Sequence, residues 1–284
     1  LERFNPDAPL EMLFDYVRIR FPTTDVQQVV ENILQLKLSY FLHEDYGFYS
    51  YSEHYALGDI FVLCSHELDK GVLVELKGRG CRQFESYLLA QQRSWYEFFM
   101  DVLVAGGVMK RLDLAINDKT GILNIPVLTE KCQQEECISV FRSFKSYRSG
   151  ELVRKEEKEC MGNTLYIGSL QSEVYFCIYE KDYEQYKKND IPIEDAEVKN
   201  RFEIRLKNER AYYAVRDLLV YDNPEHTAFK IINRYIRFVD KDDSKPRSDW
   251  KLNEEWAWFI GNNRERLELT TKPEPYSFQR TLNW

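Results

Sequence analysis

The stretch EVYFCIYEK, residues Glu173 to Lys181, decides the fold because its side chains separate into two sets. In an extended strand successive side chains point to opposite faces, so every second residue shares a face. One face then carries the apolar Val174, Phe176 and Ile178, and the other carries Tyr175, Cys177, Tyr179 and Lys181. We expect a strand with one face in the core and one polar face.

Three more stretches divide in the same way. They are GVLVELK (71–77), RLDLAIN (111–117) and RFEIRLK (201–207), and each alternates apolar residues with polar or charged ones. Such alternation is typical of antiparallel strands that pack one face against helices. Together the four stretches predict an α+β fold built on an antiparallel sheet backed by helices.

Toward the N-terminus the sequence predicts one strand–helix–meander unit. We expect a strand over 12–21, a helix through 38 that starts at the Thr23-Thr24-Asp25 cluster, meander strands within 46–51, 57–65 and 71–77, and a long helix over 81–105.

After Gly106-Gly107 the same order begins again. We expect strands over 109–117, 140–147, 164–168, 173–181 and 201–207, with helices near 127–136 and up to 219. The repetition predicts two similar units side by side, about 10–105 and 106–222, in one catalytic domain over 1–222. Helical patterns over 226–239 and 250–260 predict a C-terminal helical region over 223–284.

Composition excludes several classes of protein. Hydrophobic residues make up 44% of the 284 residues, which suits a folded core and not a disordered chain. No window approaches the roughly 20 apolar residues that span a bilayer, and no signal peptide opens the sequence, so we expect a cytoplasmic protein without membrane insertion. The six cysteines lack paired C-x-x-C spacing, which favours reduced core thiols over zinc ligands.

The charge pattern leaves a nucleic-acid partner open. The net charge of −8 argues against one, because Lys and Arg dominate phosphate binding. The distribution of charge matters more than its sum, and bases gather between Lys199 and Arg216. Such runs are either solvated faces or phosphate-binding tracks, and charge alone does not decide between them.

The polar strand faces also have two interpretations. In the first, they are ordinary charged surfaces that face water. In the second, Glu75, Asp113 and Glu203 converge as hard oxygen ligands for Mg²⁺ or Mn²⁺, with Tyr179 beside them. Arg111, Arg201, Arg205 and Lys207 would then contact DNA phosphates.

A family resemblance favours the second interpretation. The stretches LVELKGRGCRQFE (73–85), GGVMKRLDLAIND (106–118), TLYIGSLQSEVYFCIYEKDYEQ (164–185) and NRFEIRLKNERAYYAVRDLL (200–219) resemble the replication initiation factor (Rep_trans) family. That family contains the initiators of staphylococcal rolling-circle plasmids and the MOB-T relaxases of conjugative transposons and integrative elements in Gram-positive bacteria. The resemblance covers most of the chain and is closest to the relaxases.

The resemblance implies roles for particular residues. The family's nucleophilic tyrosine ends a strand before a polar residue and a lysine, which gives Tyr179 here, followed by Lys181. Its R-L-D-L-A and R-x-E strands give Asp113 and Glu203 as metal ligands, and its V-E pair gives Glu75. The chain departs from the plasmid initiators where Asn117 precedes Asp118 and where Arg205 replaces an acidic residue, so the ligand set does not carry over whole.

The implied reaction is metal-assisted transesterification. A phenol has a pKa near 10, so the nucleophile needs a lowered pKa or help with proton removal, and Lys181, Arg201 and the metal are candidates to supply it. Tyr179 would take the 5′-phosphate of one strand at an origin of transfer and leave a free 3′-hydroxyl. Tyr175, Tyr183 and Tyr186 are rival nucleophiles.

The partners implied are single-stranded or locally melted origin DNA, accessory conjugation proteins and a coupling protein, in the bacterial cytoplasm. Three alternatives stay open. They are a rolling-circle plasmid replication initiator with the same chemistry, a DNA-binding protein of the same fold without catalysis, and a metal nuclease that hydrolyses with water.

Overall fold

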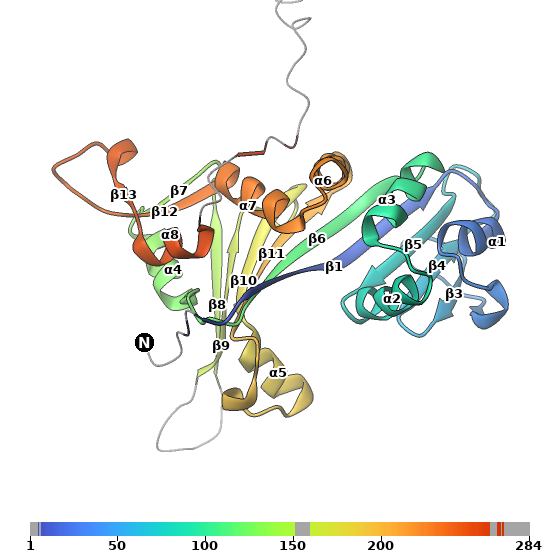
Figure 1. The fold of residues 1–284 in the computed structure, drawn as a ribbon, viewed down its shortest axis with the longest axis horizontal. Helices are drawn as coiled ribbons and strands as arrows, with labels where there is room; N and C mark the ends of the chain where they lie inside the picture. Colours follow the sequence, from blue (N-terminus) through green and yellow to red (C-terminus); the bar gives the residue numbers. More distant parts are fainter. Residues whose placement is uncertain (1–4, 6, 151–159, 262–265, 268, 270–284) are drawn as a thin grey trace, which may run out of the picture.

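The computed structural model describes residue 5 and residues 7–150, 160–261, 266–267 and 269. A ten-stranded sheet crosses the whole molecule, and its strands pair antiparallel throughout (Figure 1). Helices pack against the apolar face of this sheet. The predicted α+β fold is confirmed.

The strand order in the sheet is symmetric about its central pair. It runs β2-β3-β4-β5-β1-β6-β11-β10-β9-β8. In the first unit the strands are β1 (Leu10–Phe21), β2 (Leu42–Glu44), β3 (Glu53–Leu57), β4 (Ile60–Cys64) and β5 (Val72–Lys77). In the second unit they are β6 (Val108–Asp118), β8 (Phe144–Gly150), β9 (Cys160–Ile167), β10 (Val174–Glu180) and β11 (Asn200–Lys207).

Each unit uses the same connection. The first strand leaves for a helix and an antiparallel meander, and the last meander strand returns to pair beside the first, as β5 does with β1 and β11 with β6. The units then meet where β1 pairs with β6. The polar faces of β5, β6, β10 and β11 therefore belong to one continuous surface.

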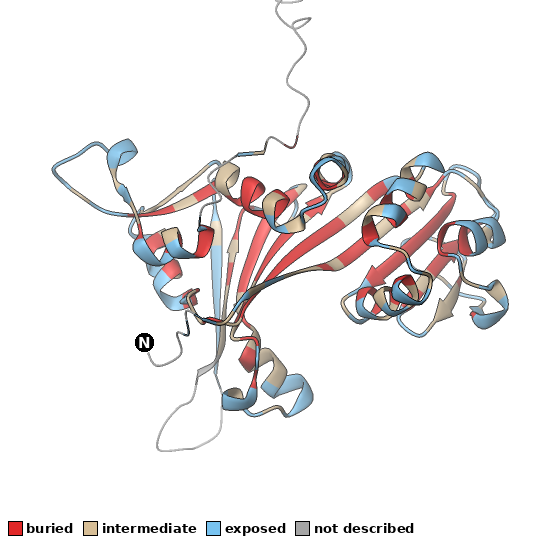
Figure 2. Ribbon diagram, viewed as in Figure 1, coloured by how far each residue is buried: buried red, intermediate tan, exposed pale blue. Residues whose placement is uncertain are grey.

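Aromatic side chains from the helices fill the core. The helices are α1 (Val26–Gln28), α2 (Arg79–Ala90), α3 (Trp95–Val104), α4 (Ile125–Gln133), α5 (Lys181–Asn189), α6 (Asn208–Tyr221), α7 (Pro224–Tyr235) and α8 (Glu254–Ile260). In the first unit the ring of Phe14 packs on Trp95 and Phe99, and in the second Phe202 packs on Phe259. Such rings bury 150–250 Å² each as a rule and dominate core energetics. Figure 2 shows the buried residues concentrated along the central strands.

The first unit differs from the prediction in its helices and in its meander, where β2 and β3 were not predicted. The helix expected over 81–105 is two helices, because Gln92 takes a left-handed backbone and Ser94 starts α3 with a capping box to Glu97. The helix expected through 38 is the short α1 and a π-helical turn over Val29–Ile33, ended by the positive φ of Gln35. The strand expected over 46–51 is wrong, and the chain turns there instead, between β2 and β3.

The second unit and the C-terminal region differ as well. The strand expected over 140–147 is replaced by β7 (Cys137–Ser139) and β8. The helix expected over 226–239 ends at Tyr235, and Ile236–Asp240 forms β12, which pairs with β7 and with β13 (Lys251–Leu252). The helix expected over 250–260 is α8, which begins only at Glu254.

Strand pairing thus ties the described part of the C-terminal region to the second unit. The domain boundary at 222 and the unit boundary at 105 stay predictions, and residues 270–284 lie outside the described residues. Within the described part of the chain, no helix is long and apolar enough to cross a membrane. Cys64, Cys81, Cys132, Cys137 and Cys177 are free thiols.

Candidate active site

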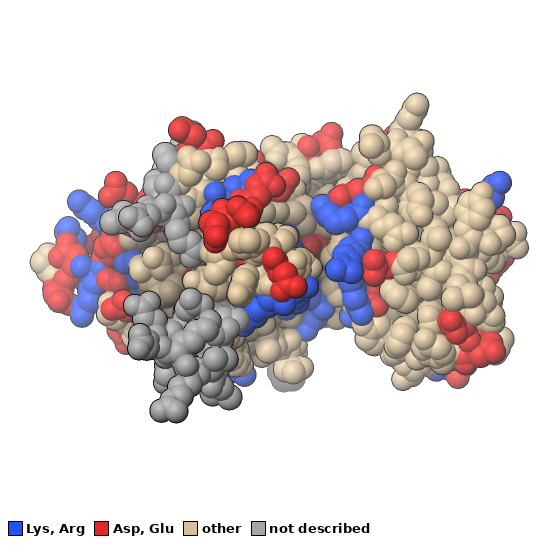
Figure 3. Space-filling view, turned by 90° about the horizontal axis from the view of Figure 1, so that it is seen from below, with Lys and Arg blue, Asp and Glu red and all other residues tan. Residues whose placement is uncertain are grey.

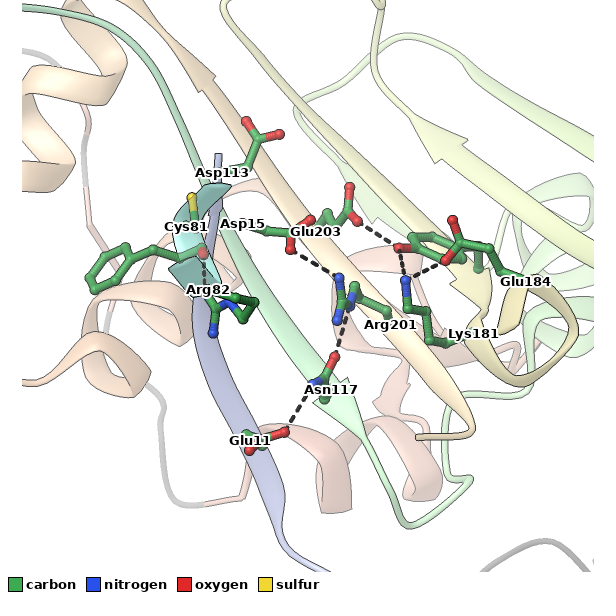
Figure 4. Close-up of polar contacts among 12 residues, drawn as sticks. Glu11, Asp15, Cys81, Arg82, Asp113, Asn117, Lys181, Glu184, Arg201 and Glu203 are labelled. Atoms are coloured by element: carbon green, nitrogen blue, oxygen red, sulfur yellow. Dashed lines mark hydrogen bonds and ion pairs between the residues drawn. The ribbon is translucent and has the colours of Figure 1, made fainter. Parts of the chain in front are cut away.

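A row of paired residues crosses the polar face of the sheet through Tyr179. Tyr179 of β10 lies opposite Arg201 of β11, Arg201 lies opposite Asn117 of β6, and Asn117 lies opposite Glu11 of β1. The Arg201 Nε donates to Asn117 Oδ1 at 2.8 Å, and the Asn117 Nδ2 donates to Glu11 Oε2 at 2.9 Å (Figure 4). The backbone register therefore fixes the position of the arginine beside the tyrosine.

The hydroxyl of Tyr179 contacts a carboxylate and an ammonium. Its Oη donates to Glu203 Oε1 at 2.8 Å, and the Lys181 Nζ lies 3.5 Å from the same Oη. Lys181 is the first residue of α5, and it also pairs with Glu184 one turn along that helix. A strand end followed at once by a helix thus sets the tyrosine and the lysine side by side.

Glu203 and Asp113 are both held by arginines from their own strands. The Arg205 Nε and Nη2 donate to Glu203 Oε2 at 2.9 and 2.7 Å, which leaves Oε1 for Tyr179. The Arg111 Nε and Nη2 donate to the two oxygens of Asp113 at 2.9 and 2.6 Å. Bidentate pairing of this kind fixes orientation as well as charge. Both carboxylates are 3% exposed, so neither is an ordinary surface charge that faces water.

Burial changes the acid–base state of the site. Burial and the charge of Glu203 raise the pKa of the Tyr179 phenol well above its usual value, although Arg201 opposes the shift. Burial also raises the pKa of Asp113 to about 6, against the opposing effect of Arg111. Tyr179 is therefore a neutral phenol near pH 7, and its attack on a phosphate requires that a base take its proton.

Asp15 enters the site from the first unit and was not predicted. The pairing of β1 with β6 shifts between Phe14 and Tyr16, so Asp15 is the extra residue of a β-bulge. Its Oδ1 accepts from Arg201 Nη1 at 3.1 Å (Figure 4). The alternation of the sequence gives no sign of a bulge. Glu184, which was missed too, stands at the i+3 position from Lys181, a spacing that does indicate a helical ion pair.

A polar cavity of about 1070 Å³ opens over these residues. The second unit contributes Tyr179, Lys181, Arg201 and Glu203 to its lining, among others. The first unit contributes a smaller set that includes Asp15, Tyr16, Lys77, Arg79 and Arg82. Figure 3 shows Lys and Arg gathered in the hollow middle of this face, between the two ends of the molecule. A site with net basic walls forms despite the acidic sequence.

The structure does not bring Glu75 together with Asp113 and Glu203. Glu75 accepts hydrogen bonds from the hydroxyls of Tyr16 and Tyr49 and pairs with Lys77 at 3.0 Å and Arg18 at 3.7 Å. It is absent from the lining of the cavity. Among the described residues, no group of three or more His, Cys, Asp or Glu stands close enough to hold a metal ion.

The expected three-carboxylate metal site therefore does not fit this arrangement. Oxygen donors of Asp113 and Glu203 are the right chemistry for Mg²⁺ or Mn²⁺. However, Arg111 occupies both oxygens of Asp113, while Arg205 and Tyr179 occupy those of Glu203. A cation would have to displace at least one guanidinium.

Most of the remaining predicted residues do meet at the cavity. Arg111, Arg201 and Arg205 line it, whereas Lys207 lies at the end of β11 and donates to the Leu170 carbonyl at 2.9 Å. Of the three rival tyrosines, Tyr183 lines the cavity. Tyr186 is 40% exposed elsewhere on α5, and Tyr175 is buried beside Arg205.

Comparison with known proteins gives consistent matches along the chain. Residues 107–284 match the family model described as replication initiation factor, and residues 11–101 match that of the rolling circle replication initiation protein N-terminal domain. The chain is 43% identical over 279 residues to NicK of Bacillus subtilis (strain 168), a protein named as a DNA relaxase, covering 98% of the chain and 78% of NicK. Its fold is similar to the solved rolling circle replication initiator protein of Geobacillus stearothermophilus, with a TM-score of 0.76 and 26% identity over 93% of the chain and 100% of that protein.

Proposed function

Because the chain belongs to the replication initiation factor family, it is a DNA-nicking protein of the relaxase and rolling-circle initiator type, and we propose that Tyr179 makes the nick. One observation carries the proposal. Within a cavity lined by arginines and lysines, the Tyr179 hydroxyl donates to Glu203 at 2.8 Å, so nucleophile and base are already in contact.

The proposed step is an in-line displacement at phosphorus. As Tyr179 Oη forms its bond to phosphorus, its proton passes to Glu203, and the bond from phosphorus to the 3′-oxygen breaks. The leaving oxygen takes a proton from water and becomes a free 3′-hydroxyl. Lys181 and Arg201 stabilise the charge that develops on the phosphate oxygens, a kind of preorganised stabilisation that is often the largest catalytic contribution.

The product is a 5′-phosphotyrosine link that keeps the energy of the phosphodiester. The 3′-hydroxyl can therefore attack the link later and rejoin the strand without ATP. Arg205 holds the second oxygen of Glu203 at 2.7 Å, so the carboxylate returns to the same position for the reverse proton transfer.

We propose a relaxase that acts at an origin of transfer, because the 43% identity to a protein named as a relaxase covers almost the whole chain. Accessory conjugation proteins and a coupling protein are then its partners, in the bacterial cytoplasm. The similarity in fold to a replication initiator favours a second candidate, nicking at a plasmid replication origin by the same step. Cleavage assays on the two kinds of origin separate these roles.

We propose a chemical role for a divalent cation but no set of residues that holds it without rearrangement. Mg²⁺ or Mn²⁺ would polarise the scissile phosphate and stabilise the leaving oxygen when bound. Asp113 and Glu203 are the carboxylates nearest to that task, but their arginine partners must first move. For this reason the proposed mechanism assigns proton transfer and charge stabilisation to the protein's own groups.

The test uses single-stranded origin oligonucleotides labelled at either the 5′ or the 3′ end. After incubation with Mg²⁺ or Mn²⁺, a denaturing gel should show the 3′ label travelling with the protein and the 5′ label in a shortened, protein-free strand. Tyr186→Phe, which alters an exposed tyrosine of α5, is the matched control and should form the same adduct. Cleavage without an adduct would contradict the proposal in favour of water hydrolysis, and binding without cleavage would contradict it in favour of a non-catalytic protein.

A further inference from the structure

A band of cationic side chains crosses the sheet beside the active site and continues into the first unit. Lys207 of β11 lies opposite Arg111 of β6, Arg111 lies opposite Arg18 of β1, and Arg18 lies opposite Glu75 of β5. The neighbouring row ends with Lys77 of β5, which lies opposite Tyr16 of β1. Strand pairing therefore places bases side by side over four strands.

Tyrosine rings alternate with these bases. The Arg111 guanidinium lies 4.0 Å from the centre of the Tyr16 ring, and the Arg18 guanidinium lies 4.8 Å from the centre of the Tyr49 ring. The Lys77 ammonium lies 5.9 Å from the Tyr49 ring. A positively charged track with interleaved aromatic rings is the usual platform for unpaired nucleic-acid strands.

The end of the band in the first unit is accessible to solvent, but the Glu75 carboxylate at that end is buried. Tyr49 is 50% exposed and the side chain of Lys77 is 55% exposed, but Glu75 beneath them is only 2% exposed. Glu75 accepts from the Tyr49 hydroxyl at 2.9 Å and pairs with Lys77 at 3.0 Å. The carboxylate therefore orients the ring and the ammonium without presenting its own charge to a phosphate.

The band is continuous with the nicking site. Tyr16, Lys77 and Arg111 line the same cavity as Tyr179. A strand whose phosphate lies at Tyr179 would reach Tyr49 by crossing Arg111 and Arg18, all on one face of the sheet. Nothing in the nicking step itself uses Tyr49, Arg18 or Lys77.

We propose that the Arg18–Tyr49–Lys77 cluster of the first unit is a binding site for single-stranded DNA that flanks the nick. Tyr49 stacks on one base, and Arg18 and Lys77 contact the adjacent phosphates. The ligand is a single strand because an exposed ring needs an unpaired base to stack on. The site rests on the proposed function, since it takes the same DNA strand as the cavity.

Binding of fluorescent oligodeoxythymidines of 8 and 20 nucleotides by anisotropy tests the site without requiring cleavage. All variants carry Tyr179→Phe so that covalent trapping does not contribute. The chain offers a matched pair in the same unit, because the Lys37 ammonium lies 5.8 Å from the ring of Tyr40, which is 61% exposed and outside the band. Tyr40→Ala and Lys37→Gln are therefore the controls for Tyr49→Ala and Lys77→Gln.

Tyr49→Ala should weaken binding of the 20-mer by about tenfold or more, which is the usual effect of losing one stacked base. Tyr49→Phe, which keeps the ring, should retain most of the affinity. Lys77→Gln should lower the slope of log affinity against log salt by about 0.7, the value for one phosphate of a single strand. A short strand has fewer nucleotides left to reach the cluster once it occupies the cavity, so the 8-mer should lose less affinity than the 20-mer.

The proposal is overturned if both band variants bind the 20-mer as tightly as their controls, or if the loss appears only on a 20-base-pair duplex. Adduct formation by the protein with native Tyr179 is measured in parallel. Loss of 20-mer binding in a protein that never forms an adduct would sink the proposed nicking function and keep this binding site. An adduct that forms while both band variants bind the 20-mer normally would support the proposed nicking function and overturn this binding site.

Discussion

Each unit of the sheet contains a tyrosine hydroxyl bonded to a buried glutamate, but the two glutamates differ in their other partners. In the second unit Glu203 accepts from Tyr179 through one oxygen and from Arg205 through the other. In the first unit Glu75 accepts from two tyrosines, Tyr16 and Tyr49, and is also paired with Lys77 and Arg18.

The difference lies in how many groups share each carboxylate. Glu75 is surrounded by donors, so a proton taken from either tyrosine would disturb several ion pairs at once. Glu203 accepts from the Arg205 guanidinium through one oxygen and from the Tyr179 hydroxyl through the other, and the Lys181 Nζ lies 3.5 Å from that hydroxyl oxygen. We therefore propose that the same motif of phenol, carboxylate and base serves chemistry in one unit and DNA binding in the other.

The largest expected effect comes from exchanging the two tyrosines for phenylalanine. Tyr179→Phe should abolish the protein–DNA adduct, because it removes the hydroxyl that donates to Glu203. Tyr16→Phe should form the adduct at a rate within a few-fold of the native protein. Denaturing gels of both variants measure this, and an adduct retained in Tyr179→Phe or lost in Tyr16→Phe would remove the distinction between the units.

Exchanging the two glutamates should give the next largest effect. Glu203→Gln should slow adduct formation by about 10² to 10⁴-fold, the usual contribution of a general base. Glu75→Gln should slow it by far less, since Glu75 touches no reacting group. Single-turnover rates on a saturating oligonucleotide compare the two variants, and equal losses would show that Glu203 has no special role.

The native protein and Glu203→Gln should also differ in how the rate of adduct formation depends on pH. Burial and Glu203 raise the pKa of Tyr179, so very little phenolate exists between pH 7 and 9. With Glu203 as the base the native rate should be nearly flat there, whereas in Glu203→Gln the residual rate should rise about tenfold per pH unit, because phenolate itself must attack. Parallel profiles for the native protein and Glu203→Gln would contradict the assignment of the base.

Asp15→Asn should have a moderate effect, because Asp15 of the first unit contacts Arg201 directly. Its carboxylate holds Arg201 at 3.1 Å. The neutral amide should loosen that arginine and slow adduct formation by roughly tenfold, a typical loss for a misplaced charge that stabilises the transition state. Affinity for DNA, measured by anisotropy, should change little, and a loss confined to affinity would argue against a positioning role.

The smallest effect should be on stability. Tyr16→Phe removes one of the hydroxyls that satisfy Glu75 and should lower the free energy of unfolding by about 2 kcal/mol, as for a hydrogen bond to a buried charge. Urea denaturation measures this, with Tyr40→Phe as a control at an exposed tyrosine. Equal stability of the two variants would mean that the Tyr16 hydroxyl is not needed by Glu75.

Period-two alternation was sufficient to predict the strands that carry the site. It assigned Tyr179, Asp113 and Glu203 to the polar face of one sheet, and the structure places all three in the lining of one cavity over that face. The elements predicted poorly depend on single backbone conformations. Gln92 breaks the helix expected over 81–105 with a φ of 55°, and a propensity pattern carries no information on such a residue.

The site itself was predictable only in part. Glu75 and Glu203 look alike in sequence, each in the middle of an alternating strand, but β1 and β6 lie between their strands. Asp15 was missed because a bulge turns it toward Arg201. The contacts of Arg201 with Asn117 and Asp15 follow from cross-strand register, which is set by the packing of the whole sheet.

The most direct test of the account is to find the residue that carries the DNA. The native protein is reacted with a single-stranded origin oligonucleotide, the adduct is digested with protease and nuclease, and the peptide that keeps a 5′-nucleotide is sequenced by mass spectrometry. The proposed mechanism predicts a modified peptide with the nucleotide on Tyr179. A nucleotide on Tyr175, Tyr183 or Tyr186, with Tyr179 unmodified, would contradict it.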